Sequence, residues 1–171
     1  MNYLDQERDV VDRGIALWDA EKPELDCSGK AITGRILSLS EIVEQAMNAS
    51  LRDLGIRYSS YAIIATLRAV GAPYKMSPGQ LQNTLVFSSG GISNLIRRVE
   101  KEGYITRETD PSDGRGVLVA LTPSGIDLAD RAMPLQAAAE LHLIRMLTPE
   151  EQAVMTNLLR RMLVMNRNGL R

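Results

Sequence analysis

The chain has 171 residues with 20 basic and 21 acidic side chains, which gives a formal net charge of −1. This length suits one compact domain with extensions, and a hydrophobic share of 44% is too high for a disordered chain. No apolar run approaches the ~20 residues that a membrane helix needs, and the acidic N-terminus is unlike a secretion signal. A single cysteine, Cys27, excludes an internal disulfide framework. We therefore expect a cytoplasmic protein with no membrane segment.

The sequence lacks the residue combinations that enzymes and metal sites need. One histidine, His142, and one cysteine cannot form a zinc site of the usual spacing. A nucleophile–histidine pair would have to use His142, which lies in a stretch typical of a helix. The glycines at 90–91 and at 114 and 116 do not fit a phosphate-binding loop. We predict that the protein is not an enzyme and has no cofactor or metal.

Hydrophobic periodicity and capping residues predict a mainly helical chain. In chain order, the predicted helices cover about 5–20, 30–54, 59–70, 77–84 and 89–102, and later about 123–146 and 149–167. The period changes to two in residues 104–108 and 116–121, which predicts a short two-stranded hairpin. Because one hairpin is not stable alone, it must pack on the helices.

This order of elements predicts a mainly α fold with a small β-hairpin wing. The expected architecture is a winged helix-turn-helix domain with dimerisation helices at both ends of the chain. The predicted domains are an N-terminal extension with dimerisation helices over 1–54, the DNA-binding domain over 55–122, and C-terminal dimerisation helices over 123–171.

The near-zero net charge hides an uneven distribution along the chain. Residues 1–53 hold 11 acidic and 6 basic side chains, and residues 100–171 hold 10 acidic and 9 basic ones. Residues 54–99 hold five basic side chains and no acidic one. This acid-free tract coincides with the predicted helix-turn-helix, and a surface without carboxylates suits an element that faces phosphates. The alternative is a polar surface that is neutral by chance.

The predicted helix over 89–102 has one face suited to the core and one suited to a DNA groove. Ile92, Leu95, Ile96 and Val99 fall at i, i+3, i+4 and i+7, so they face the core. Small and polar residues on the other side, together with the start of the preceding short helix, are candidate contacts to bases or phosphates. The candidate DNA-binding residues are Ser77, Gln80, Ser88, Ser89, Gly90, Ser93, Asn94, Arg97 and Arg98.

Two alternatives stay open for these candidates. Ser88 and Ser89 can serve only as helix caps, although an exposed helix N-terminus also binds phosphate. Either Arg97 or Arg98 can fork onto a guanine or hold a phosphate, and the sequence does not distinguish between them.

The turn between the two predicted strands carries one arginine at its tip. Arg115 lies between Gly114 and Gly116, and Asp113 precedes them as a candidate for shaping the wing turn. An arginine on a flexible tip can enter a narrow minor groove, where the negative potential is highest. We therefore add Arg115 to the candidate DNA-binding residues.

At two places the sequence resembles the MarR family of bacterial transcription regulators. The stretch Asp110-Pro-Ser-Asp-Gly-Arg115, followed by Leu121-Thr-Pro-Ser-Gly125, is similar to the family's wing and wing exit. The stretch from Ser93 to Ile105 is similar to its recognition helix running into the wing. The resemblance covers about residues 59–125, and the flanking helices fit too.

The resemblance implies what the protein does and with what it associates. It implies a homodimer whose two recognition helices enter major grooves of double-stranded DNA and whose wings enter minor grooves at a pseudo-palindromic operator. It also implies a ligand- or stress-responsive regulator, usually a repressor, in the bacterial cytoplasm. The alternative is a winged-helix module that contacts proteins and binds no specific DNA.

A few residues bear on the signal that such a regulator senses. The added N-terminal helix with Trp18 resembles the urate-responsive branch of the family, and Arg107 matches a branch arginine. Ala62 and Leu95 stand where that branch has charged residues. A small aromatic or anionic effector held by Trp18, Arg35 and Tyr61 is the alternative, as is a purely structural role for Trp18. Cys27 is a candidate redox sensor or an incidental thiol.

Overall fold

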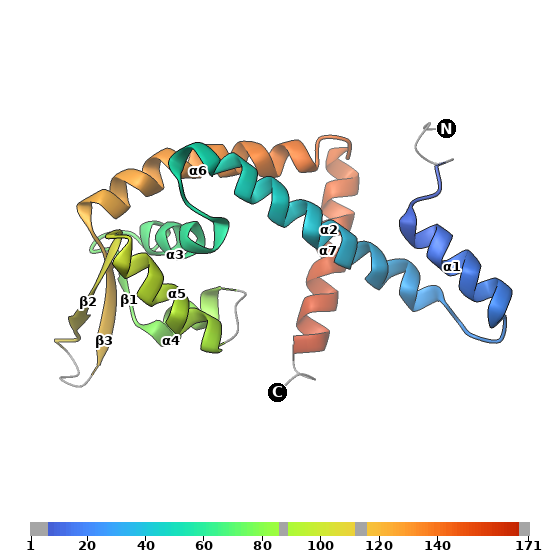
Figure 1. The fold of residues 1–171 in the computed structure, drawn as a ribbon, viewed down its shortest axis with the longest axis horizontal. Helices are drawn as coiled ribbons and strands as arrows, with labels where there is room; N and C mark the ends of the chain where they lie inside the picture. The colour runs from blue at the N-terminus through green and yellow to red at the C-terminus, as the bar shows by residue number, and fades with distance from the viewer. Residues whose placement is uncertain (1–6, 86–88, 112–115, 168–171) are drawn as a thin grey trace. The chain divides into compact units, whose positions relative to one another are not determined.

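A computed structural model describes residues 7–85, 89–111 and 116–167 of the chain (Figure 1). The chain divides into two compact units, Met1–Ala46 and Met47–Arg171, and helix α2 belongs to both. The helices are α1 (Val10–Glu21), α2 (Ser28–Ser50), the 3-10 turn η2 (Arg52–Leu54), α3 (Tyr58–Ala69), α4 (Pro78–Thr84), α5 (Ser89–Lys101), α6 (Pro123–Leu143) and α7 (Pro149–Arg167). The strands are β1 (Lys75–Met76), β2 (Ile105–Thr109) and β3 (Val117–Leu121).

The first unit consists of α1 and the N-terminal part of α2. Helix α1 begins later than the predicted residue 5, because the Asp9 side chain accepts hydrogen bonds from the backbone N–H groups of Val11 and Asp12 at 2.8 and 3.0 Å and caps the helix. Arg35 of α2 then donates to the carboxylates of Asp9 and Asp12 at 2.8 and 2.6 Å. Val11 is the buried residue of α1, and it packs against Gly34 of α2.

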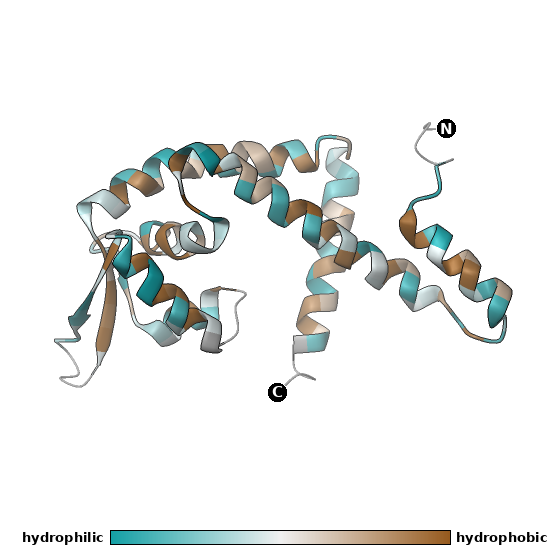
Figure 2. Ribbon diagram, in the orientation of Figure 1, coloured by the Kyte–Doolittle hydropathy of each residue, from teal (hydrophilic) through white to brown (hydrophobic). Residues whose placement is uncertain are grey.

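The second unit holds the predicted winged helix-turn-helix, which the structure confirms. In Figure 1, α6 runs along one side of α3, and α4, α5 and the sheet lie on the other side. The apolar face predicted for α5 is buried, with Ile92, Leu95, Ile96 and Val99 at most 6% exposed. These side chains pack in one core with Ile63, Ile64 and Leu67 of α3, and hydrophobic ribbon segments alternate with hydrophilic ones along α5 in Figure 2.

The wing differs from the predicted two-stranded hairpin because it has three antiparallel strands in the order β1-β3-β2. Strands β2 and β3 pair from Ile105 with Leu121 to Thr109 with Val117. Strand β1 adds two residues on the other edge of β3, with Lys75 opposite Ala120. A strand of two residues carries no alternation that a sequence pattern can reveal, so β1 depends on its pairing with β3.

The start of α6 is fixed to the end of α5. Thr122 caps α6, and both its hydroxyl and that of Ser124 donate to the Gly103 carbonyl oxygen, at 2.8 and 3.1 Å. The backbone N–H of Thr122 donates to the Tyr104 carbonyl at 3.0 Å. Gly125 permits this approach, since a Cβ atom there would lie 2.1 Å from the Tyr104 carbonyl oxygen.

Farther along, α6 is fixed to the last turn of α2. Helix α6 continues through Pro134 to the buried Gln136. The Gln136 amide nitrogen donates to the Met47 carbonyl and the Ser50 hydroxyl, both at 2.8 Å. Asn48 of the same turn accepts from the backbone N–H of Tyr58 at 3.0 Å, so the end of α2 also caps α3. The second unit is therefore held together by contacts at the start of α6 and at Gln136.

Helix α7 packs little within its own chain. A capping box begins the helix, since Thr148 and Glu151 exchange backbone-to-side-chain hydrogen bonds of 2.8 and 3.3 Å. None of the described side chains of α7 is buried, and its exposed apolar residues are Val154, Met155, Leu158, Leu159, Leu163, Val164 and Met165. Within the described residues, no helix has the length and hydropathy to cross a membrane.

Candidate nucleic-acid interface

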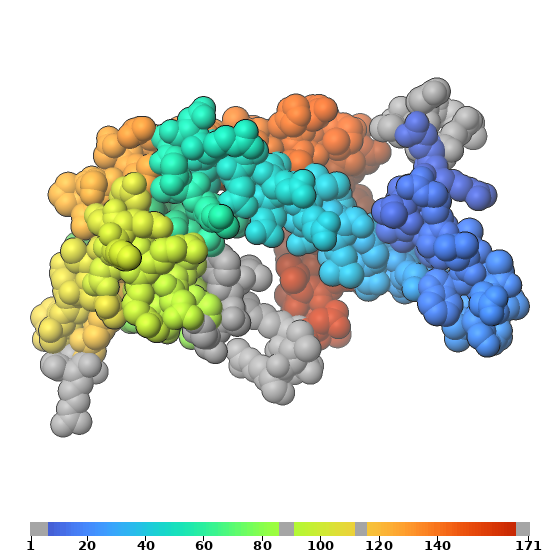
Figure 3. All heavy atoms as spheres, viewed as in Figure 1, coloured from blue at the N-terminus to red at the C-terminus, as the bar shows by residue number. Residues whose placement is uncertain are grey.

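The outward face of α5 is the centre of the candidate interface. Ser93, Asn94, Arg97, Arg98 and Lys101 are all exposed, and they lie opposite the buried apolar face of the same helix. In the space-filling view, α5, drawn in yellow-green, lies at the surface of the second unit (Figure 3). The buried face fixes the helix, so the outward side chains are presented by a rigid element. A helix of this kind is the element that proteins place in the major groove.

Helix α4 precedes α5 and starts at a capping box formed by two of the candidate residues. The Ser77 backbone N–H donates to Oε1 of Gln80 at 2.8 Å, and the Gln80 backbone N–H donates to Oγ of Ser77 at 3.2 Å. The predicted helix start is thus confirmed. Both side chains are engaged within the chain, and their contact with DNA stays a prediction.

The acid-free tract is far less positive in the fold than in the sequence. Arg68 pairs with Asp130 of α6 at 2.8 Å, and Lys75 pairs with Glu108 of β2. Both carboxylates come from residues later than 99, so counting charges along the sequence could not reveal them. Of the five basic residues in the tract, Arg57 and Arg97 have no hydrogen-bonding or ionic partner in the described part of the chain.

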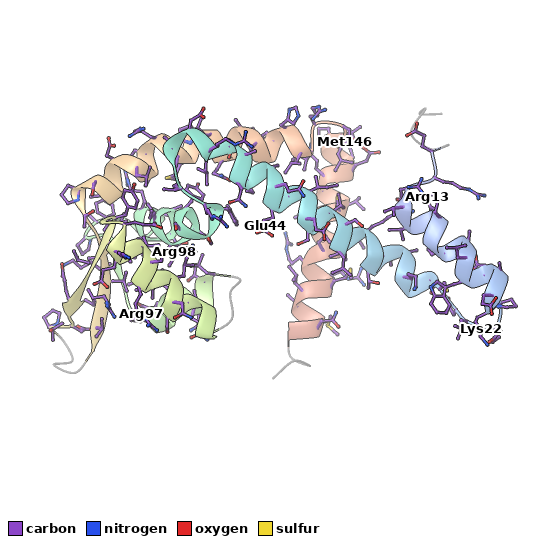
Figure 4. The ribbon with its side chains drawn as sticks, in the orientation of Figure 1. Arg13, Lys22, Glu44, Arg97, Arg98 and Met146 are labelled. Carbon is purple, nitrogen blue, oxygen red and sulfur yellow. The ribbon has the colours of Figure 1, made fainter. Side chains whose placement is uncertain are left out.

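The two neighbouring arginines of α5 differ in their surroundings (Figure 4). Nη2 of Arg98 donates to the hydroxyls of Ser59 and Ser60, at 2.6 and 3.3 Å, and its Nε lies 3.7 Å from Glu102. Arg97 makes no such contact with the described residues. The sequence placed both in one candidate set, because residue type and spacing do not show which side chain is already bound.

A third arginine, Arg107 of β2, connects the wing to α5. Its guanidinium forms a two-pronged pair with Glu100 of α5, with donor–acceptor distances of 3.1 and 2.6 Å. The hydrogen bond from Arg107 is the main cause that lowers the pKa of Glu100, so this carboxylate stays charged at neutral pH. The structure therefore gives Arg107 a bond within the winged helix-turn-helix.

Several predicted site residues fall partly or wholly outside the described structure. Ser88, Asp113, Gly114 and Arg115 lie outside the described residues. Ser89 and Gly90 form the first turn of α5. Gly116 is described, and its carbonyl accepts from the backbone N–H of Asp110 at 2.9 Å, which closes the base of the wing turn.

The three candidate effector residues lie in different units. Trp18 and Arg35 belong to the first unit, where Lys30 lies 4.7 Å above the Trp18 ring and Arg35 is paired with two carboxylates. Tyr61 belongs to α3, and its ring centroid lies 6.2 Å from that of Tyr58. Burial chiefly raises the pKa of Tyr61, with contributions from Glu140 and Tyr58. The charge of Arg35 is thus balanced within its own unit.

The candidates for catalysis and redox chemistry also have defined places. His142 is exposed in α6, and Cys27 is half-buried directly before α2. The Asp26 carboxylate beside Cys27 accepts from the backbone N–H of Ser28 at 2.8 Å. In the described part of the chain, no three histidine, cysteine, aspartate or glutamate side chains are grouped as metal ligands.

Comparison with known proteins agrees with this geometry. A family model described as the MarR family matches residues 54–116. The HTH-type transcriptional regulator PecS of Dickeya dadantii is 29% identical over 147 residues, which cover 86% of this chain and 89% of PecS. A mutant MarR from Escherichia coli complexed with operator DNA is 25% identical, with a TM-score of 0.71, and the match covers 81% of this chain and 99% of that one.

A further solved structure shares the fold over a longer part of the chain. It is the organohalide-sensing transcriptional regulator RdhR in its 2,4-dichlorophenol-bound form, at 20% identity and a TM-score of 0.73. The match covers 95% of this chain and 88% of that one. The chain thus shares the winged helix-turn-helix fold with these transcription regulators, and its sequence is similar to the MarR family over residues 54–116.

Proposed function

We propose that the protein is a transcription regulator of the MarR family that binds a pseudo-palindromic operator in double-stranded DNA as a homodimer and acts as a repressor. The observation that carries the proposal is the outward face of α5, which is polar, exposed and held by a fully packed apolar face. The MarR protein of Escherichia coli, solved with operator DNA, supports the same use of the fold. In each half-site, α5 lies in the major groove and Arg115 of the wing reaches the minor groove.

The homodimer is supported by apolar surface that one chain leaves open. Helix α7 presents a series of exposed apolar residues, and in α2 Ile32, Leu37 and Ile42 are 51% to 70% exposed. Exposed apolar surface of this extent is typical of association surfaces. A second copy is the partner that a two-fold operator requires. In this proposal, residues 1–54 and 123–171 form the dimer, and residues 55–122 contact DNA.

The remaining candidates take places around α5. Ser89, Gly90, Ser93 and Asn94 lie in its first half, where small side chains let the backbone approach the base edges. Ser77 caps α4, Gln80 lies in the first turn of α4, and Ser88 precedes α5 in the sequence. These three residues are proposed to contact phosphates. Contacts to phosphates position the protein on the DNA, and contacts to base edges give it sequence preference.

Selection of bound DNA from a random pool tests the function directly. We expect an inverted repeat to be enriched, and we expect its affinity to fall steeply with salt, because each phosphate contact releases counterions. The control is a scrambled duplex of the same length and composition. A pool without enrichment, or an affinity for the repeat that does not change with salt, would show a protein-binding module instead.

We also propose a small aromatic or anionic effector rather than urate. The N-terminal helix extension resembles the urate-responsive branch, but Ala62 and Leu95 supply no charge where that branch has charged residues. RdhR, which shares the fold, was solved with 2,4-dichlorophenol. Trp18, Arg35 and Tyr61 stay the proposed effector contacts, and the indole ring of Trp18 and the phenol ring of Tyr61 suit an aromatic ligand.

Trp18 is the single tryptophan of the chain and gives this proposal a direct readout. We expect 2,4-dichlorophenol to change its fluorescence and to lower operator affinity at the same concentrations, while urate does neither. Tyr61→Phe serves as a probe of the phenol group. A response to urate alone, or no response to either compound, contradicts the proposal.

A further inference from the structure

We infer that the two neighbouring arginines of α5 have separate tasks: Arg97 contacts DNA, and Arg98 is a positioning residue that holds α5 against α3. The inference rests on the proposed function, because it assigns roles within the DNA-contacting helix. It assigns different roles to two residues that the sequence alone does not distinguish.

Arg98 is bound within the protein on three sides. Its Nη2 donates to Ser59 at 2.6 Å and to Ser60 at 3.3 Å, and its Nε lies 3.7 Å from the Glu102 carboxylate. Both serines lie in the first turn of α3, and Ser60 is only 1% exposed. Moving the guanidinium to DNA would leave a buried hydroxyl without its donor, which is unfavourable.

The hydrogen bonds of Arg98 to α3 orient α5. Helix α3 forms the middle of the core through Ile63, Ile64 and Leu67, so its first turn is a fixed point. Arg98 lies in the second half of α5 and connects that half to this point. A guanidinium has its hydrogen-bond donors in a rigid plane. It therefore fixes the orientation of α5 relative to α3, which a lysine ammonium could not do.

Arg97 is exposed and has no partner among the described residues. Its natural helix partner would be Glu100, three residues later on the same side of α5. Glu100 is instead occupied by the two-pronged bond to Arg107 of the wing, at 3.1 and 2.6 Å. The wing thus removes the carboxylate that would otherwise neutralise Arg97.

The neighbours of Arg97 indicate what its free guanidinium meets. Asn94 lies three residues before it and Lys101 four residues after it, so the three exposed side chains share one side of the helix. A free guanidinium on this side can bind two acceptors in one plane, either the O6 and N7 atoms of guanine or two phosphate oxygens. Loss of a guanine contact and loss of a phosphate contact change DNA binding in different ways, so one variant of Arg97 distinguishes the two acceptors.

Removal of Arg97 tests the first half of the inference. On the operator found by selection, we expect Arg97→Ala to weaken binding by about 5- to 150-fold, the scale of one specific contact, with an unchanged melting temperature. A guanine contact predicts relaxed preference at one base pair, and a phosphate contact predicts a salt slope smaller by about one. Arg131→Ala is the matched control, because it removes the same charge from an exposed i,i+4 pair on α6.

Arg98 is tested together with the two serines that it binds. We expect Arg98→Ala to weaken operator binding while the salt slope and base preference stay unchanged. The double variant Ser59→Ala/Ser60→Ala, which leaves both arginines in place, should weaken binding in the same way. Combining all three changes should cost no more than Arg98→Ala alone, because both sets of changes remove one link.

Each contrary outcome is distinct. A salt slope or base preference altered by Arg98→Ala, or further loss when Arg98 is removed from the serine variant, shows a direct DNA contact and overturns the inference. Unchanged affinity in Arg97→Ala overturns it as well. If Arg98→Ala does not fold, Arg98→Gln and the serine variant carry the test. If the wild-type protein binds no selected DNA, the proposed function itself is wrong.

Discussion

Replacing Gly125 with alanine is expected to lower the free energy of unfolding by about 3 kcal/mol or more, which is the upper range for overpacking. A Cβ atom at this position would lie 2.1 Å from the Tyr104 carbonyl oxygen and 3.1 Å from Cδ2 of Leu121. The carbonyl cannot move away freely, since it accepts the Thr122 backbone N–H at 3.0 Å, within the link between α5 and α6. The clash therefore disturbs the wing base, α5 and α6 together.

Urea or thermal unfolding measures this loss, and a second glycine serves as the control. At Gly79 of α4, the nearest atom to an added Cβ is Oγ of Ser77 at 3.9 Å, an ordinary contact. Gly79→Ala should leave stability unchanged or raise it by up to ~1 kcal/mol, because alanine has the higher helix propensity. A Gly125→Ala protein with the stability of the wild type would show that the junction adapts.

The second large effect is expected at α7, where two charges should abolish the dimer. Leu158 and Leu159 are 51% and 37% exposed within one chain, so Leu158→Glu/Leu159→Glu leaves no cavity in the second unit. Two carboxylates in a dimer interface would be desolvated without partners, which is strongly unfavourable. Operator affinity should then fall by about 100-fold or more, since binding at one half-site no longer brings a second, linked copy close to the other half-site.

Analytical ultracentrifugation and operator titration check this result on the same samples. Asn157→Glu is the control, because it adds a charge at an exposed polar position of the same helix. The control should remain dimeric and bind the operator normally. A leucine variant that stays dimeric would place the dimer interface elsewhere, and a monomeric wild type that binds the inverted repeat would remove the dimer from the proposal.

Local signals in the sequence predicted most of the elements. The helix start at Ser77 and Gln80 and the one at Thr148 each depend on residues within four positions, so the pattern contains all that decides them. The apolar spacing of α5 likewise fixed which face is buried. Prediction failed at β1, because two residues have no periodicity and join the sheet only through β3.

The charge pattern shows why the site was harder to predict than the fold. Asp130 and Glu108 reach Arg68 and Lys75 across 62 and 33 positions, and such pairs leave no mark in the local sequence. Arg97 and Arg98 are identical as letters and adjacent in the chain. They differ in their contacts, because in the folded chain Arg98 donates to the first turn of α3.

Among the described side chains of α7 none is buried, and this has a consequence for how much of the protein a cell must make. A helix whose described side chains are all at least partly exposed contributes little to the folded state of a single copy. Under the proposed dimer, the free energy that holds α7 in place is association free energy, which depends on concentration through mass action. Synthesis and dilution of the protein would then change the fraction of chains competent for the operator, even when no effector is present.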